Sequence, residues 1–273
     1  YGNVQVVKSG ENGAALASVK FGVYSDSACK NKLTELTTGT DGTATSGDIP
    51  VGTVYLKELS TVSPYIISTE VKSAAITTNA IAKVSFTNVA AKGKIRIEKV
   101  GEVLMSSKSE ETEYGNVTIP AYTQKGLKGV VYEVKDSAGK VVVTLTTDDF
   151  GVAETEMLPL GQYTVQETSA PAAYIVDDTV HKVTLAYKDQ NTPVVTVTVK
   201  ADNELRTGGV KIRKITEKFN YENIDFYNAL AEGYVFGLYT AETIGDVPAD
   251  VLVEVLTTDS HGAVSYTHLR AHE

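Results

Sequence analysis

The sequence contains very little cysteine, which limits both its chemistry and its means of stabilisation. Cys29 is the single cysteine among 273 residues, so the chain can form no internal disulfide and offers no thiol pair to a metal. Tryptophan is absent, and no apolar run reaches the roughly eighteen residues of a membrane-spanning helix. No initiator methionine or apolar signal segment opens the chain, and we interpret it as an interior fragment.

Positive charge and catalytic motifs are also scarce. The 34 acidic side chains outnumber the 25 basic ones, and the net charge of -9 would repel a phosphate backbone. The richest basic stretch, residues 92–99, alternates with apolar residues as a half-buried strand does, so we expect no nucleic-acid partner. GxSxG, HExxH, P-loop and Cys–His patterns are missing, which argues against an enzyme with external substrates and predicts no cofactor.

What the sequence does contain is a repeat. Its 42% hydrophobic and 22% charged residues are typical of globular domains, and its length suggests two or three of them. Each unit opens with an alternating strand that ends in lysine: VQVVK at 4–8, IRIEK at 95–99 and VKIRK at 210–214. A second strand begins with leucine at 16–24, 127–135 and 230–239. A Thr-Thr turn with aspartate and glycine follows at 37–42, 146–151 and 257–262.

The spacing after this turn is the same in the first two units. Proline, glycine and glutamate follow the turn glycine at offsets of 8, 10 and 16 in both: Pro50, Gly52 and Glu58, then Pro159, Gly161 and Glu167. Each unit then closes with an alternating strand that ends in asparagine, at 81–88 and 194–203. We place the units at 1–90, 91–206 and 207–273, with the third incomplete.

Short β-branched runs bounded by turn residues predict an all-β fold of tandem antiparallel sandwiches. Residues 220–232 are the weak exception, and their Asn-rich polarity favours a loop. The connections between units are short, which predicts a stiff row of domains.

Three residue types recur at matching places in the two complete units: Lys8, Glu58 and Asn88, then Lys99, Glu167 and Asn203. If the first and last strands are neighbours, a lysine amine could attack the asparagine carboxamide and release ammonia. Burial would favour the neutral amine, and a protonated glutamate could hydrogen-bond to the carboxamide oxygen and shuttle protons. The alternative is that these are ordinary surface residues at strand ends, but their recurrence favours the reactive interpretation.

The segment YTVQETSAPAAY at 163–174, preceded by LPLGQ, resembles the E-box of Gram-positive pilins and the Cna protein B-type, SpaA-like prealbumin fold. The first unit has a looser version, VYLKELSTVSPY at 54–65. The resemblance implies a prealbumin-like, reverse immunoglobulin-like sandwich with self-formed isopeptide bonds. It implies bonds from Lys8 to Asn88 and from Lys99 to Asn203, with Glu58 and Glu167 as the catalysts.

The third unit departs from this pattern. It has Lys214, but we expect its glutamate and asparagine partners beyond the end of the chain, so this site is incomplete. The final run SYTHLRAHE resembles a translated sequencing adapter, and we interpret the residues from about 265 as not native. His261, His268 and His272 lie in or beside this tail, so no metal site is expected. Cys29 has no histidine in its unit, and we predict a turn and no catalytic role for it.

The leading functional hypothesis is a structural stalk of a Gram-positive surface adhesin or pilin, located extracellularly at the cell wall. Its partners would be other pilin or adhesin domains of the same chain, with peptidoglycan attachment through a missing C-terminal region. The first alternative is a module that recognises a host extracellular-matrix protein or glycan through a loop or inter-domain surface; the longest variable segment, residues 101–126, would then be the place to examine. The second is a hydrolytic or carbohydrate-active enzyme that carries these domains as spacers.

Overall fold

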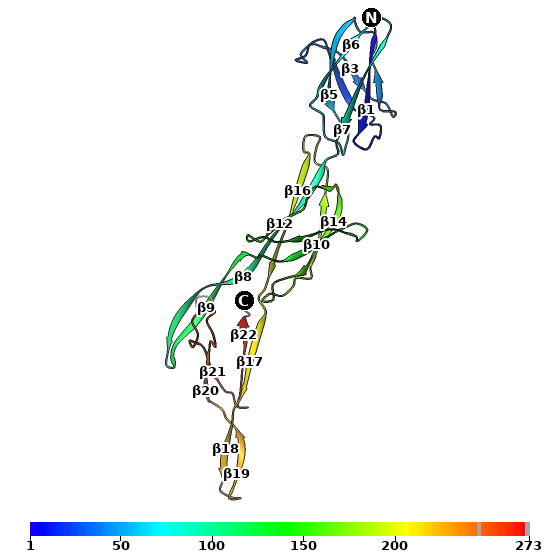
Figure 1. Ribbon diagram of the computed structural model, residues 1–273. Helices are drawn as coiled ribbons and strands as arrows, with labels where there is room; N and C mark the ends of the chain where they lie inside the picture. Colours follow the sequence, from blue (N-terminus) through cyan, green and yellow to red (C-terminus); the bar gives the residue numbers. More distant parts are fainter. Residues whose placement is uncertain (245–246, 271–273) are drawn as a thin grey trace.

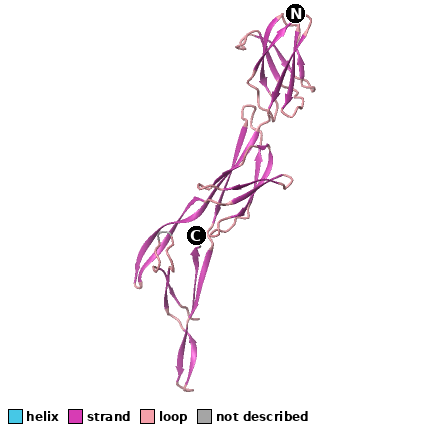
Figure 2. Ribbon diagram, in the orientation of Figure 1, coloured by secondary structure: helices cyan, strands magenta, loops and turns pink. Residues whose placement is uncertain are grey.

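Strands make up all the regular secondary structure in the part of the chain that the computed structural model describes, residues 1–244 and 247–270. They form three groups that follow one another along an elongated molecule, with the N-terminus at one end (Figure 1). Figure 2 shows the same groups as strands joined by loops. The predicted all-β fold class is therefore confirmed.

The first unit is a sandwich of two sheets with the strand orders β4-β1-β7 and β3-β2-β5-β6. Its strands are β1 (Asn3–Gly10), β2 (Lys20–Tyr24), β3 (Lys32–Thr37), β4 (Thr43–Thr45), β5 (Gly52–Ser60), β6 (Val71–Ile76) and β7 (Ile81–Asn88). Buried and partly exposed residues alternate strictly along β1, because successive side chains point to opposite faces. This alternation turns Val4, Val6 and Lys8 toward the core.

The first and last strands of this unit lie side by side and run parallel. Gly10 pairs with Asn88, and Lys8 pairs with Phe86 two positions earlier. Since residues two apart on a strand share a face, Lys8 and Asn88 both point into the core near the same end of the sandwich. The condition on which the lysine–asparagine reaction depends, that the first and last strands are neighbours, is met in this unit. The sheets are otherwise antiparallel, as expected, in the residues that the structure describes, apart from the equivalent pair in the second unit.

The second unit repeats this plan with one addition. Its strands are β8 (Lys92–Thr112), β9 (Gly115–Gly126), β10 (Val131–Asp136), β11 (Val141–Thr146), β12 (Val152–Glu154), β13 (Leu158–Pro159), β14 (Gly161–Ser169), β15 (Val180–Leu185) and β16 (Val194–Asn203). β16 pairs parallel with β8, so that Gly101 lies opposite Asn203. The addition is a long hairpin, in which β8 continues past the lysine and returns as β9. The variable segment 101–126 is thus an extended hairpin.

The third group has three two-stranded sheets in the described residues. They are β17 (Thr207–Arg213) with β22 (Ala263–Arg270), β18 (Ile215–Asn220) with β19 (Asp225–Leu230), and β20 (Val235–Tyr239) with β21 (Leu252–Thr257). The prediction of a loop at 220–232 is wrong for Asn220, which ends β18, and for residues 225–230, which form β19. Phe219 of β18 and Phe226 of β19 face each other with ring centroids 4.9 Å apart, and such cross-strand aromatic pairs stabilise a hairpin. Of the suspected tail, residues 265–270 belong to β22, and residues 271–273 lie outside the described residues.

One hydrogen-bond pattern recurs in all three groups. The hydroxyl of the second threonine in each Thr-Thr turn donates to the carbonyl oxygen at the start of the second-strand segment. The pairs are Thr38 with Leu16 (2.6 Å), Thr147 with Leu127 (2.7 Å) and Thr258 with Ala231 (2.6 Å). The third pair shows that Ala231, and not Leu230, is the equivalent of the two leucines.

Candidate crosslinking site

The three predicted residues of the first unit meet inside the sandwich. Lys8 comes from β1, Glu58 from β5 of the opposite sheet, and Asn88 from the end of β7. Each is no more than 2% exposed. An isolated buried charge is strongly unfavourable, and this lysine and glutamate can be accommodated because they face each other.

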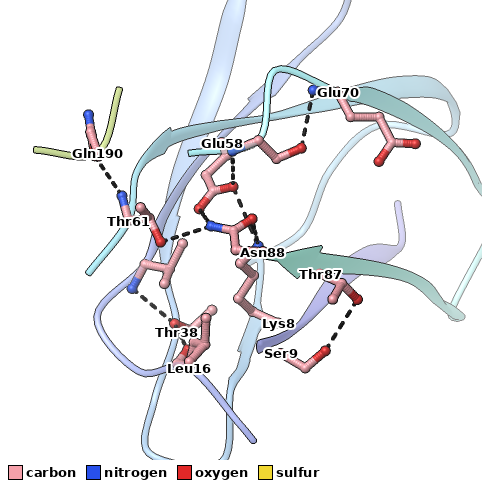
Figure 3. A network of polar contacts seen from close by, with 12 residues as sticks. Lys8, Ser9, Leu16, Thr38, Glu58, Thr61, Glu70, Thr87, Asn88 and Gln190 are labelled. Carbon is pink, nitrogen blue, oxygen red and sulfur yellow. Dashed lines mark hydrogen bonds and ion pairs between the residues drawn. The ribbon is translucent and has the colours of Figure 1, made fainter. Parts of the chain in front are cut away.

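Glu58 bridges the other two side chains (Figure 3). Its Oε1 accepts a hydrogen bond from Asn88 Nδ2 at 2.7 Å, and its Oε2 lies 3.4 Å from Lys8 Nζ. Lys8 Nζ also contacts Asn88 Oδ1 directly. One carboxyl group therefore touches both the nitrogen that would attack and the nitrogen that would leave.

This arrangement differs from the sequence-based expectation in one respect. The expected contact joined the glutamate to the carboxamide oxygen, whereas Glu58 accepts from the carboxamide nitrogen and Lys8 occupies the oxygen side. An ionised carboxylate can only accept hydrogen bonds, so the Asn88 carboxamide turns its NH2 group, and not its oxygen, toward Glu58. A proton taken from the lysine can thus be passed to the departing nitrogen by the same carboxyl group.

Burial also changes the acid–base behaviour of the attacking group. Desolvation lowers the pKa of Lys8 below its usual value of 10.5, although the negative charge of Glu58 opposes this effect. The Phe21 ring, with its centroid 6.0 Å from Lys8 Nζ, forms part of the apolar surroundings. The site therefore favours the neutral amine more than water does, as nucleophilic attack requires.

The second unit assembles the same set of residues. Lys99 Nζ lies 3.0 Å from Glu167 Oε2, and both side chains are at most 1% exposed. Asn203 Nδ2 donates to Glu167 Oε1 at 2.7 Å, the same distance as in the first site. Among the described residues, Asn203 Oδ1 is buried without a hydrogen-bond partner, and Lys99 Nζ, although it is ion-paired with Glu167, makes no hydrogen bond of good geometry. An unsatisfied buried polar atom calls for an explanation, and both atoms belong to groups that an amide bond would join.

The two sites differ at the residue opposite the glutamate. Phe21 pairs with Glu58 in the first unit, and Tyr132 pairs with Glu167 in the second. The Tyr132 hydroxyl donates to Glu167 Oε2 at 3.3 Å, and burial together with the Glu167 charge raises the pKa of Tyr132. Tyr132 was not predicted from the sequence, because a tyrosine among apolar strand residues looks like an ordinary core residue.

A glycine and a tyrosine complete each site and were also missed. A Cβ atom on Gly10 would lie 2.5 Å from the Tyr65 hydroxyl, and one on Gly101 would lie 2.8 Å from the Tyr174 ring. Each glycine stands two residues after the lysine, opposite the asparagine. The recurrence of Lys-x-Gly in both units was the available signal.

Lys214 has the backbone position of its counterparts but different surroundings. Its N–H donates to the turn carbonyl of Gly262 at 2.7 Å, as Lys8 does to Gly42 at 2.8 Å. The side chain is half-buried, and Nζ lies 5.4 Å from the Tyr234 ring centroid. Within the described residues, the third unit thus presents the lysine without the carboxylate and carboxamide geometry of the other two sites.

Other kinds of site receive no support from the described residues. Within them, no three His, Cys, Asp or Glu side chains are placed to hold a metal ion. His272 lies outside the described residues, as does the side chain of His268, while His261 is exposed. Residues 1–244 and 247–270 contain no helix that is long and apolar enough to cross a membrane. Cys29 lies in a turn after β2, with its thiol half-exposed.

Comparison with known proteins identifies the fold family. A model of the SpaA prealbumin-like fold domain matches residues 2–90 and 115–203. The chain belongs to this family. The second SpaA match begins inside the β8–β9 hairpin, so Lys99 precedes it. Pairing of β8 with β16 nevertheless puts Lys99 opposite Ala201, two residues before Asn203, just as Lys8 lies opposite Phe86, two residues before Asn88.

Two relatives and one solved structure extend this result. Serine-aspartate repeat-containing protein E from Staphylococcus aureus strains Mu50 and N315 is 33% identical over 154 residues, or 54% of this chain. The match covers 13% of that protein's length. The Bacillus anthracis TIE protein aligns over 97% of this chain and 43% of its own, with a TM-score of 0.62 and 22% identity. That likeness supports the SpaA-type fold alone.

Proposed function

We propose that this chain is a load-bearing stalk segment of a Gram-positive surface adhesin or pilin, and that isopeptide bonds from Lys8 to Asn88 and from Lys99 to Asn203 lock its first two domains. The observation that carries the proposal is the buried Lys–Glu–Asn contact, which occurs twice with the same 2.7 Å bond between glutamate and asparagine. Units 1–90, 91–206 and 207–273 are the proposed domains. Family membership and the match to the staphylococcal serine-aspartate repeat-containing protein E support the stalk role.

The proposed step balances within the three side chains. The lysine ammonium gives one proton to the glutamate, and the neutral Nζ attacks the asparagine Cγ. The Nζ–Cγ bond forms and the Cγ–Nδ2 bond breaks. The glutamate passes its proton to the leaving nitrogen, which departs as ammonia, and takes a second proton from Nζ, so that one proton stays on the amide nitrogen and the carboxyl group ends protonated. Because the product is a neutral amide, the reaction removes the buried lysine charge. The chain acts on itself once and is not an enzyme for other molecules.

The intact mass of the purified chain tests this proposal. We expect a mass lower than the sequence mass by two ammonia molecules, with branched peptides joining Lys8 to Asn88 and Lys99 to Asn203 after proteolysis. Glu58→Ala and Glu167→Ala should each restore one ammonia. Glu35→Ala, at an exposed position of the first domain, should restore none. An unmodified mass for the unchanged chain would refute self-crosslinking.

A binding role is the second candidate, and the β8–β9 hairpin favours it. A cleft lies between this hairpin and the third unit, lined by Tyr114 and Ile119 on one side and Val253 and Tyr266 on the other. Tyr114 is exposed, as is Met105 nearer the base of the hairpin. Replacing residues 103–124 by a short turn should abolish binding to matrix proteins or glycans if the hairpin recognises them. Unchanged binding, with both crosslinks intact, would exclude this role for the hairpin.

A further inference from the structure

The junction between the first two domains is made by one loop of the second. This junction loop, residues 186–193, connects β15 to β16 and reaches across to the first domain. Gln190 makes two contacts there: its side-chain Oε1 accepts from the Thr61 N–H, and its backbone carbonyl accepts from the Ile67 N–H, both at 2.9 Å. The Tyr187 hydroxyl donates to the Tyr65 carbonyl at 3.2 Å.

The junction loop is itself held in a fixed turn. Asp189 Oδ1 accepts from the Asn191 N–H at 2.8 Å and from the Thr192 hydroxyl at 3.0 Å. These bonds lower the pKa of Asp189, so the carboxylate stays ionised and keeps accepting. Gln190 is therefore presented to the first domain by a pre-formed turn.

The segment that Gln190 holds lies against the first crosslinking site, and Figure 3 shows Gln190 next to Thr61 and Thr61 next to Asn88. Near one end of this segment, residues 61–68, the Thr61 hydroxyl accepts from Asn88 Nδ2 at 2.9 Å. At the other end, the Ser68 N–H donates to Glu58 Oε2 at 3.0 Å. Gln190 binds Thr61 and the neighbour of Ser68, so it fixes this segment close to both of its contacts with the reacting groups.

These contacts determine how the carboxamide is oriented. Asn88 Nδ2 has two hydrogens, and one is directed to Glu58 Oε1 while the other is directed to Thr61 Oγ1. With both hydrogens engaged, the plane of the carboxamide is fixed relative to Lys8. The second site lacks the hydroxyl that accepts this second hydrogen bond, because the residue three positions after the glutamate is Ala170 there and Thr61 in the first site. There the Tyr132 hydroxyl supports Glu167 from within the same domain.

We propose that Gln190 is a positioning residue for the Lys8–Asn88 bond, so that docking of the second domain prepares the first domain for crosslinking. This inference rests on the proposed self-crosslinking. Gln190 acts through Thr61: it holds the Thr61 backbone, and the Thr61 hydroxyl holds the carboxamide under attack. The first domain consequently reacts fastest after the second domain has folded against it.

The rate of bond formation during synthesis tests the proposal. The chain is made in a cell-free system, samples are denatured at intervals, and the two branched peptides are quantified by mass spectrometry. Gln190→Ala should slow the Lys8–Asn88 bond roughly three- to tenfold, as expected for one lost hydrogen bond. It should leave the Lys99–Asn203 bond unchanged. Gln190→Glu keeps the acceptor oxygen and should restore the rate.

Two further variants show whether the effect passes through Thr61. Gln162→Ala changes an exposed glutamine in β14 of the same domain and should alter neither bond. Thr61→Val removes the hydroxyl but keeps the N–H, and Gln190→Ala should add little further slowing in that background. A full additional slowing would overturn the proposed route through Thr61.

The outcomes separate this inference from the proposed function. If the unchanged chain never forms the Lys8–Asn88 bond, self-crosslinking of the first domain fails. If it forms this bond at the same rate with and without Gln190, the positioning role is refuted while self-crosslinking stands. Equal slowing of both bonds by Gln190→Ala would show that the substitution disturbs the second domain as a whole, and would also overturn the positioning role.

Discussion

Removing one lysine should make one domain, and only that domain, extensible under force. A bond from Lys8 to Asn88 would carry tension from the first strand straight to the last, bypassing every residue between them. Lys8→Ala removes this route, so the first sandwich has to resist with hydrogen bonds and packing alone. Lys99→Ala should have the same effect on the second domain.

The expected lengths follow from the positions of the crosslinks. The chain advances 80 residues from Lys8 to Asn88 and 104 from Lys99 to Asn203. At about 3.5 Å per extended residue, Lys8→Ala should release about 280 Å of hidden chain and Lys99→Ala about 360 Å. The two lengths differ enough to show which domain has opened. By analogy with disulfides, each loop closure should also stabilise its domain by about 4 to 5 kcal/mol, although the mechanical effect is the larger one.

Single-molecule pulling between residues 1 and 207 measures these lengths. Cysteines at these two positions serve as handles, with Cys29→Ser to leave no competing thiol. The unmodified chain should show neither step, and Lys20→Ala, which removes an exposed lysine of the first domain, should behave in the same way. A step of either length in the unmodified chain would refute the covalent route for tension.

Three other outcomes are expected. Gly101→Ala should destabilise the second domain by about 1 to 3 kcal/mol in urea unfolding, because its Cβ would lie 2.8 Å from the Tyr174 ring; unchanged stability would contradict this packing argument. In an uncrosslinked Asn88→Ala chain, the pKa of Lys8 is lower in the folded state than its usual value of 10.5 in the unfolded state. Between these two pKa values the unfolded state binds more protons than the folded state, so the free energy of unfolding should rise with pH in this window. Adding Lys8→Met should remove the rise, and persistence of the slope would assign it to another group. Cys29→Ser should leave both crosslinks and the intact mass otherwise unchanged, and loss of either bond would disprove a passive role for this thiol.

The two Lys–Glu–Asn triads could be found from sequence because each depends on local rules. Alternation in VQVVK turns Lys8 to the same face as Val4 and Val6, and that face is the core. The equal offset of 16 residues from the turn glycine to Glu58 and Glu167 identified the catalytic candidates. Neither rule required knowledge of the sheet partners.

The supporting residues could not be found in this way. Gln190 and Thr61 are 129 residues apart, and no periodic pattern links a loop of one domain to a loop of another. The hairpin that contains β18 and β19 was missed because its Asn-rich composition favours a loop, whereas pairing of Phe219 with Phe226 decides its conformation. The first contact joins residues far apart in the sequence, and in the second a cross-strand aromatic pair outweighs the local preference for a loop.

The parallel course of the first and last strands also explains how such a chain can lengthen. A chain that enters along β1 and leaves along β7 in the same direction exits at the opposite end of the domain. With an antiparallel pair it would exit where it entered, and a following copy would fold back beside the first. Duplication of this unit therefore adds reach at each step, and the short connections at residues 89–91 and 204–206 keep the copies in line (Figure 1).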